Sequence, residues 1–154
     1  MGVMVRCQEL EVEVDHYGFA FQDVDDTVVP VEYPEGRGSG ALLTEFPGRL
    51  DVESAGHTHV AAMLVEVWDA EPVAQPVADW DDRGDAEIVL ASGELAVWGV
   101  TAGPLEETLR LSDGPGRWAV RLYVRGRAEV ARLAQEGVPV GVERYLVQVW
   151  PTEA

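Results

Sequence analysis

The chain has 154 residues, of which 47% are hydrophobic, and this is enough apolar material for the packed core of one domain. Its 28 acidic residues outnumber 11 basic residues, all of them arginine, and the formal net charge is −17. This charge argues against binding to nucleic acid or to an anionic membrane surface, because phosphate binding requires Lys and Arg. It favours a basic protein partner, since opposite charge speeds association. The same charge also confers solubility without any partner.

Cysteine usage and targeting patterns narrow the class further. Cys7 is the only cysteine, which excludes an intramolecular disulfide and a cysteine-based zinc site, and we interpret it as a packed thiol. The first residues do not show the charged region and apolar run of a signal peptide. No stretch approaches 18 apolar residues. We therefore expect a cytoplasmic protein without a cofactor.

The first half of the chain shows mainly the two-residue period of β-strands. Acidic and apolar residues alternate strictly over residues 9–15, which predicts a half-buried strand whose acids face water. Residues 28–32 are rich in apolar residues, but Pro30 and Pro34 predict an edge strand. The Pro47–Gly48 pair predicts a turn between two strands. The other predicted elements are strands at residues 41–46, 49–53 and 60–68 and a long acidic loop at residues 69–85.

The second half contains two short turns that predict hairpins. The first joins residues 87–90 to 94–100, and the second joins residues 105–111 to 117–126. A short helix is expected over residues 128–135, before Gly137, and residues 144–150 form a closing strand. Eight to ten short strands without a long helix predict an all-β fold, a two-layer antiparallel β-sandwich of jelly-roll type with at most one or two short helices. We expect one domain over residues 1–154.

Alternate residues of the strand at 117–127 place several arginines on one face. Even positions are apolar and form the core face, whereas the odd positions include Arg121, Tyr123, Arg125 and Arg127. Two interpretations remain open. The arginines form an exposed ladder with an acid stripe such as Glu9, Glu11 and Glu13, in which case removing one costs little. Alternatively they form an anion site, since the planar guanidinium group suits carboxylates.

The acidic segment at residues 79–85, at the end of the predicted loop, is the second candidate site. It begins like a calcium loop, but Arg83 and Leu90 replace two required ligands. We interpret it as a solvated loop whose acids contact a basic partner, and the residues proposed for that contact are Asp79, Trp80, Asp81, Asp82 and Asp85. The pair His57 and His59 lacks a third zinc ligand, and we interpret the two residues as surface or loop histidines. No metal site is therefore predicted.

Catalytic motifs are missing from the sequence. It contains no nucleophile elbow, no phosphate-binding loop and no dinucleotide fingerprint. We therefore predict no catalytic residues and no enzyme. Tryptophans in strands usually build the core of a sandwich. Trp98 shares its strand face with Ala96 and Glu94, so it is alternatively a candidate platform for a sugar or a peptide if it is exposed.

Three segments of the second half resemble a known family. They are residues 92–98, the Gly-rich turn and strand at residues 114–127 that ends in Arg-Gly-Arg, and the closing strand at residues 143–151 that ends in Gln-x-Trp-Pro. These segments are similar to those of small bacterial β-sandwich proteins related to competence protein J, an inhibitor of a DNA-entry nuclease. The resemblance implies a sandwich fold and an inhibitor-like function. It assigns no functional residues.

Two functional hypotheses follow. The first is an acidic module that docks a basic protein, such as a nuclease, in the manner of an inhibitor or immunity protein. The alternative is a small-molecule or carbohydrate binding module that uses Trp98 and the arginine face. The sequence does not predict the oligomeric state.

Overall fold

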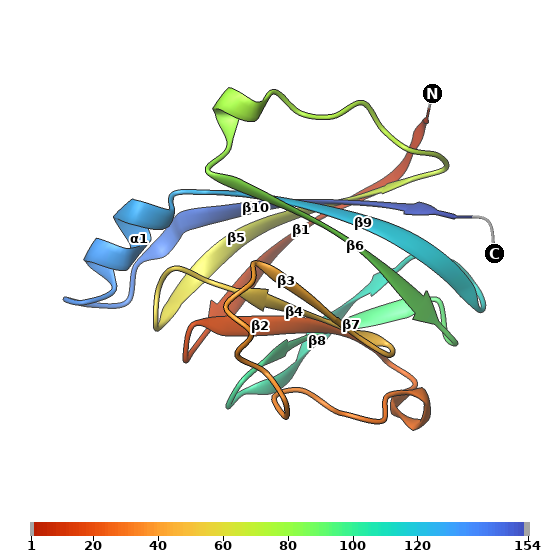
Figure 1. Cartoon of the computed structure of the whole chain (residues 1–154), viewed down its shortest axis with the longest axis horizontal. Helices are drawn as coiled ribbons and strands as arrows, with labels where there is room; N and C mark the ends of the chain where they lie inside the picture. The colour runs from red at the N-terminus through yellow and green to blue at the C-terminus, as the bar shows by residue number, and fades with distance from the viewer. Residues whose placement is uncertain (1, 153–154) are drawn as a thin grey trace.

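The computed structural model describes residues 2–152, and their strands form two five-stranded sheets stacked face to face (Figure 1). In the first sheet the order is β1 (Met4–Val14), β5 (His59–Trp68), β10 (Val140–Pro151), β9 (Gly116–Arg125) and β6 (Asp82–Leu90). In the second sheet it is β3 (Leu43–Phe46), β4 (Arg49–Glu53), β2 (Gly18–Asp23), β7 (Glu94–Gly99) and β8 (Gly103–Arg110). The predicted all-β sandwich is confirmed. Neighbouring strands are antiparallel except for the parallel pair β5 and β10.

The core lies between the sheets and follows the alternation of the sequence. In β1, Leu10, Val12 and Val14 are buried, whereas the intervening acids face outward. The outward residues of β5 are only partly exposed, so this sheet carries a second layer of contacts on its outer face. Phe19 and Leu122 are fully buried in one cluster that draws on both sheets. Burial of this apolar surface is the main force that holds the two sheets together.

The two predicted hairpins are wrong, because both turns pass from one sheet to the other. The turn at residues 91–93 connects β6 of the first sheet to β7 of the second, and residues 111–115 connect β8 back to β9. The buried Asp23 carboxylate accepts hydrogen bonds from Ala91 N at 2.7 Å and from the Ser92 hydroxyl. Gly93 has φ of 74°, and a Cβ there would lie 2.6 Å from the carbonyl oxygens of the other crossing. The two crossings thus pack against each other.

Two long loops cover the outer faces of the sandwich (Figure 1). The 69–81 loop, which contains the short 3-10 helix η2 (Val77–Asp79), passes over the first sheet. The 24–42 loop, which contains η1 (Asp26–Val28), passes over the second sheet, and the edge strand predicted at residues 28–32 is absent from it. The expected short helix is present as α1 (Arg127–Leu133). The loops therefore decide which outward side chains reach solvent.

Candidate functional site

The strand register places the predicted arginine face in rows across the outer side of the first sheet. Each row crosses β5, β10 and β9, and two of the rows also reach β6. The rows are Glu66, Gln148, Arg121 and Asp85; then Leu64, Leu146, Tyr123 and Arg83; then Ala62, Arg144 and Arg125. Carboxylates and guanidinium groups therefore share one sheet face with apolar residues between them.

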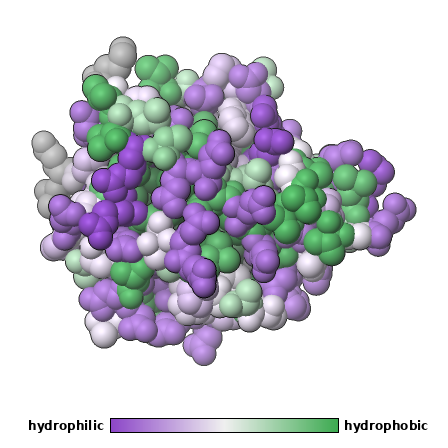
Figure 2. All heavy atoms as spheres, turned by 180° about the vertical axis from the view of Figure 1, so that it is seen from behind, coloured by the Kyte–Doolittle hydropathy of each residue, from purple (hydrophilic) through white to green (hydrophobic). Residues whose placement is uncertain are grey.

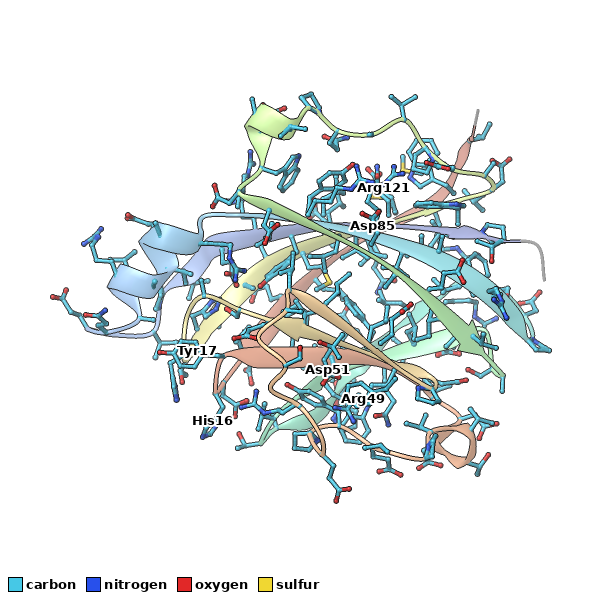
Figure 3. All side chains as sticks on the ribbon, viewed as in Figure 1. His16, Tyr17, Arg49, Asp51, Asp85 and Arg121 are labelled. Atoms are coloured by element: carbon cyan, nitrogen blue, oxygen red, sulfur yellow. The ribbon has the colours of Figure 1, made fainter. Side chains whose placement is uncertain are left out.

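Arg121 is buried under the 69–81 loop, with 4% of the residue exposed (Figure 3). Its guanidinium group donates to Glu71 Oε2 at 2.7 Å and to the Pro72 carbonyl at 3.1 Å, and it lies 3.7 Å from Asp85 Oδ1. It also lies 4.8 Å from the centre of the Trp150 ring. The expected exposed ladder with Glu9, Glu11 and Glu13 is wrong, because β5 and β10 separate β1 from β9. Arg121 instead holds the loop onto the sheet.

The other three residues of the predicted anion site do not share one open surface. Tyr123 is buried, and its hydroxyl accepts a hydrogen bond from Gln75 N at 3.0 Å. Arg127 belongs to α1, and its side chain donates to Glu143 at 3.3 Å. Arg125 is exposed and lies 5.2 Å from the Trp80 ring. Only Arg125 of this set is free to meet a ligand.

The acidic loop residues differ in how far their charge is already compensated. Asp85 forms two 3.0 Å contacts with Arg83, and Asp81 accepts from the backbone N of Arg127 at 3.1 Å, at the start of α1. Asp79 and Asp82 are exposed, and no ion pair of the described residues involves either of them. The ring of Trp80 is half-buried against Tyr123, at 5.4 Å. β6 begins at Asp82, so the loop predicted over residues 69–85 ends earlier than expected. The outward charge of this segment is therefore carried mainly by Asp79 in the loop and Asp82 at the start of β6.

A groove of about 810 Å³ runs over the outer face of the first sheet beside the loop. Its floor is made of Ala62, Leu64 and Leu146, and Trp80 and Gln75 of the 69–81 loop line it. Charged side chains of opposite sign also line it: Glu9, Glu11, Glu66 and Glu107, and Arg125 and Arg144. This volume lies in the range typical of ligand-binding pockets.

A buried polar network at one end of the sandwich was not predicted from the sequence. The Ser54 hydroxyl lies 2.7 Å from His59 Nε2 and donates to Glu143 at 2.6 Å, and the Tyr145 hydroxyl donates to the same carboxylate at 2.6 Å. His59 is buried, contrary to its interpretation as a surface histidine, and burial lowers its pKa although Glu143 opposes this effect. Burial also raises the pKa of Tyr145.

Ser54, His59 and Glu143 do not form the relay of a serine hydrolase. In such a relay the acid contacts one ring nitrogen of histidine and the nucleophile contacts the other. Here both Ser54 and Glu143 lie near Nε2, at 2.7 and 3.5 Å, and all three residues are at most 3% exposed. The network ties β5, β10 and the end of β4 together, and Arg127 adds α1 to it.

The outer face of the second sheet contains a matching buried arginine. Arg49 forms two 2.6 Å hydrogen bonds with Asp51 and donates to the Val31 carbonyl of the 24–42 loop at 2.8 Å (Figure 3). Trp98 lies half-buried on this sheet, paired with Ala20. Trp98 and the arginine face therefore lie on different sheets and do not form one site.

The hydrophilic surface of the molecule agrees with its acidic composition. In Figure 2 the visible face is mostly hydrophilic, with apolar residues gathered at the end where α1 lies.

Cys7 is exposed, so its interpretation as a packed thiol is wrong. Within residues 2–152 no helix is long and apolar enough to cross a membrane. In the same part of the chain, no three His, Cys, Asp or Glu side chains converge in an arrangement that fits a metal ion.

Solved structures share this fold. ComJ from Bacillus subtilis, described as an inhibitor of the DNA-degrading activity of NucA, matches with a TM-score of 0.64 over 99% of each chain at 15% identity. The product of crocagin biosynthetic gene J matches with a TM-score of 0.62 at 12% identity, over 96% of this chain and 98% of the other. No family model and no curated sequence matches. The chain thus has the fold of ComJ, as the sequence resemblance implied, and the likeness covers both halves.

Proposed function

We propose that this chain is a non-catalytic binding module that docks a basic protein through its acidic surface and inhibits it, with a nuclease as the partner class. The observation that carries the proposal is a net charge of −17 on a chain with the fold of a nuclease inhibitor. A nuclease site is built to hold phosphates, and surface carboxylates compete for the same basic groups. Opposite charge also steers the two proteins together.

The 69–81 loop and the start of β6 supply the contact surface in this proposal. Asp79 and Asp82 face solvent without an ion-pair partner and meet the basic side chains directly. Asp81 and Asp85 are also exposed, but each is already bound within the chain, so they add to the negative field and do not make the direct contacts. Trp80 supports the loop from below by packing on Tyr123. Arg121 in turn holds the loop on the sheet, so the loop presents its acidic residues in a fixed position.

The test is inhibition of DNA degradation by a NucA-like nuclease from the organism that encodes this chain. The Asp79→Asn/Asp82→Asn double variant is expected to inhibit at least about fivefold less well, because contacts between charges across an interface set association rate and specificity. The control is Glu32→Gln/Glu35→Gln, which makes the same charge change on the exposed 24–42 loop of the other sheet. Equal weakening by both variants would show that only net charge matters and would contradict the proposed surface.

The alternative, an anion or sugar site built from Arg121, Tyr123, Arg125 and Arg127, has less support. Three of these four side chains already form hydrogen bonds within the molecule. A ligand would have to displace those bonds, and a buried group that loses its partner costs free energy.

A further inference from the structure

Arg125 and Arg144 stand apart from the other arginines of the chain. Within residues 2–152, the side chains of the other nine all form a hydrogen bond or an ion pair, whereas these two form neither. They lie directly opposite each other on β9 and β10, and both are exposed. Like charges at such a position repel each other. Acidic residues are abundant in this chain, so two adjacent arginines without a counter-ion point to an anion supplied from outside.

The surroundings of this pair limit the kind of anion that fits. Glu9 and Glu11 lie on β1, across the groove floor from the arginines, and Glu66 lies on β5 beside the floor residues. No ion pair of the described residues involves any of these three. A polyanion spread along the groove would meet these carboxylates and be repelled. The floor between the two rims is apolar, formed by Ala62, Leu64 and Leu146. The groove is therefore basic at one rim, apolar in the middle and acidic at the other rim.

We propose that this groove binds a short extended peptide with a free amino end and a free carboxyl end. Its carboxylate binds between Arg125 and Arg144, its apolar side chains lie on Leu64 and Leu146, and its ammonium group lies at Glu9 and Glu11. Arginine suits the first contact because its planar fork pairs with both oxygens of a carboxylate. The Trp80 ring already contacts Arg125, at 5.2 Å, and forms part of the wall.

The size of the groove agrees with a peptide of about three residues. Glu11, Ala62 and Arg144 lie in register on adjacent strands, and neighbouring strands are about 4.8 Å apart, so the acidic and basic rims are separated by roughly 10 Å. Three extended residues also span about 10 Å. Such a ligand has no net charge, so the overall negative field of the protein does not oppose its binding.

The test uses trileucine with free ends as the probe and calorimetry together with the NMR signal of the Trp80 indole N–H as readouts. Saturable binding is expected, and the Trp80 signal is expected to move because Arg125 rests on that ring. N-acetyl-trileucine lacks the ammonium group and trileucine amide lacks the carboxylate. Each is expected to bind at least about tenfold more weakly, since each loses a charge-assisted contact. Trp80→Phe identifies the signal.

Variants assign the two rims. Arg144→Ala is expected to lower the affinity for trileucine at least about tenfold. The variant protein is also expected to bind trileucine and trileucine amide with equal affinity. Glu11→Gln is expected to make N-acetylation less harmful. The matched control is Arg132→Ala, which removes an exposed arginine of α1 that does not line the groove and is expected to change nothing.

Several results would overturn the proposal. One is the lack of saturable binding at millimolar trileucine. Another is an equal affinity for trileucine and for either blocked peptide. A third is an unchanged affinity for trileucine in Arg144→Ala. Because Arg144 and Glu11 are exposed, these variants are expected to keep the wild-type unfolding midpoint. A lost affinity can then be assigned to the groove. The nuclease assay does not depend on this outcome, since its variants change Asp79 and Asp82, which do not line the groove.

Discussion

Replacing Arg121 with alanine tests whether this buried side chain holds the 69–81 loop on the first sheet. The change removes the hydrogen bond to the Pro72 carbonyl, the ion pair with Glu71 and the contact with Trp150. The bond from a charged donor contributes about 1.5–3 kcal/mol. The Glu71 side chain is 64% exposed, so that pair contributes only about 0–1 kcal/mol. Loss of the buried alkyl stem adds about 1–2 kcal/mol.

The expected loss for Arg121→Ala is therefore about 2.5–6 kcal/mol in the free energy of unfolding, measured by urea denaturation with an unchanged m-value. The control is Arg117→Ala on the same strand. Arg117 is exposed and its contact with Glu87 is 3.5 Å long, so its loss is expected to be about 0–0.5 kcal/mol. A loss in Arg121→Ala no larger than in the control would refute the role of Arg121 in holding the loop.

Three further outcomes are expected. Arg49→Ala leaves the largely buried Asp51 without its partner, and a loss of about 3–5 kcal/mol is expected in thermal or urea unfolding; a loss below 1 kcal/mol would contradict the buried pair. His59 has a pKa below its ordinary value of 6.5 because of burial, so the unfolded state binds more protons and stability falls as pH drops below about 6.5; His57→Asn should keep this dependence in urea midpoints between pH 5 and 8, and a flat profile would contradict it. Cys7 is exposed as a residue, but partial desolvation of its thiol, with help from nearby Glu66 and Glu9, raises the pKa of that thiol, so at pH 7.5 iodoacetamide should react with it more slowly than with free cysteine; an equal or faster rate would contradict the raised pKa.

Local patterns predicted the strands but not how they are connected. The alternation in β1 predicts its buried and exposed faces because both follow from the two-residue period of a strand. The turns at residues 91–93 and 111–115 are short enough for hairpins, and nothing in their composition distinguishes a hairpin from a crossing between sheets. The parallel pair β5 and β10 joins segments about 80 residues apart, and their pairing depends on the whole fold.

The candidate sites show the same division. The spacing of Arg121, Tyr123 and Arg125 places them correctly on one strand face, but the path of the 69–81 loop decides that only Arg125 stays exposed. Arg144 and Glu11 are brought beside it by strand pairing over a long sequence distance. His59 meets Ser54, which follows β4, and Glu143 of β10, and it is buried between them. A local sequence pattern does not predict contacts between residues that are far apart in the chain.

The most direct test of the proposed function is the salt dependence of binding between this chain and a NucA-like nuclease from the same organism. The association rate is measured by stopped flow from about 0.05 to 0.5 M NaCl, a range over which the screening length falls from about 14 to 4 Å. If acidic surface charge directs docking, the rate is expected to fall by at least about tenfold, while dissociation changes little. An association rate that does not depend on salt, although the chain inhibits the nuclease, would contradict the proposal. The lack of binding at low salt would also contradict it.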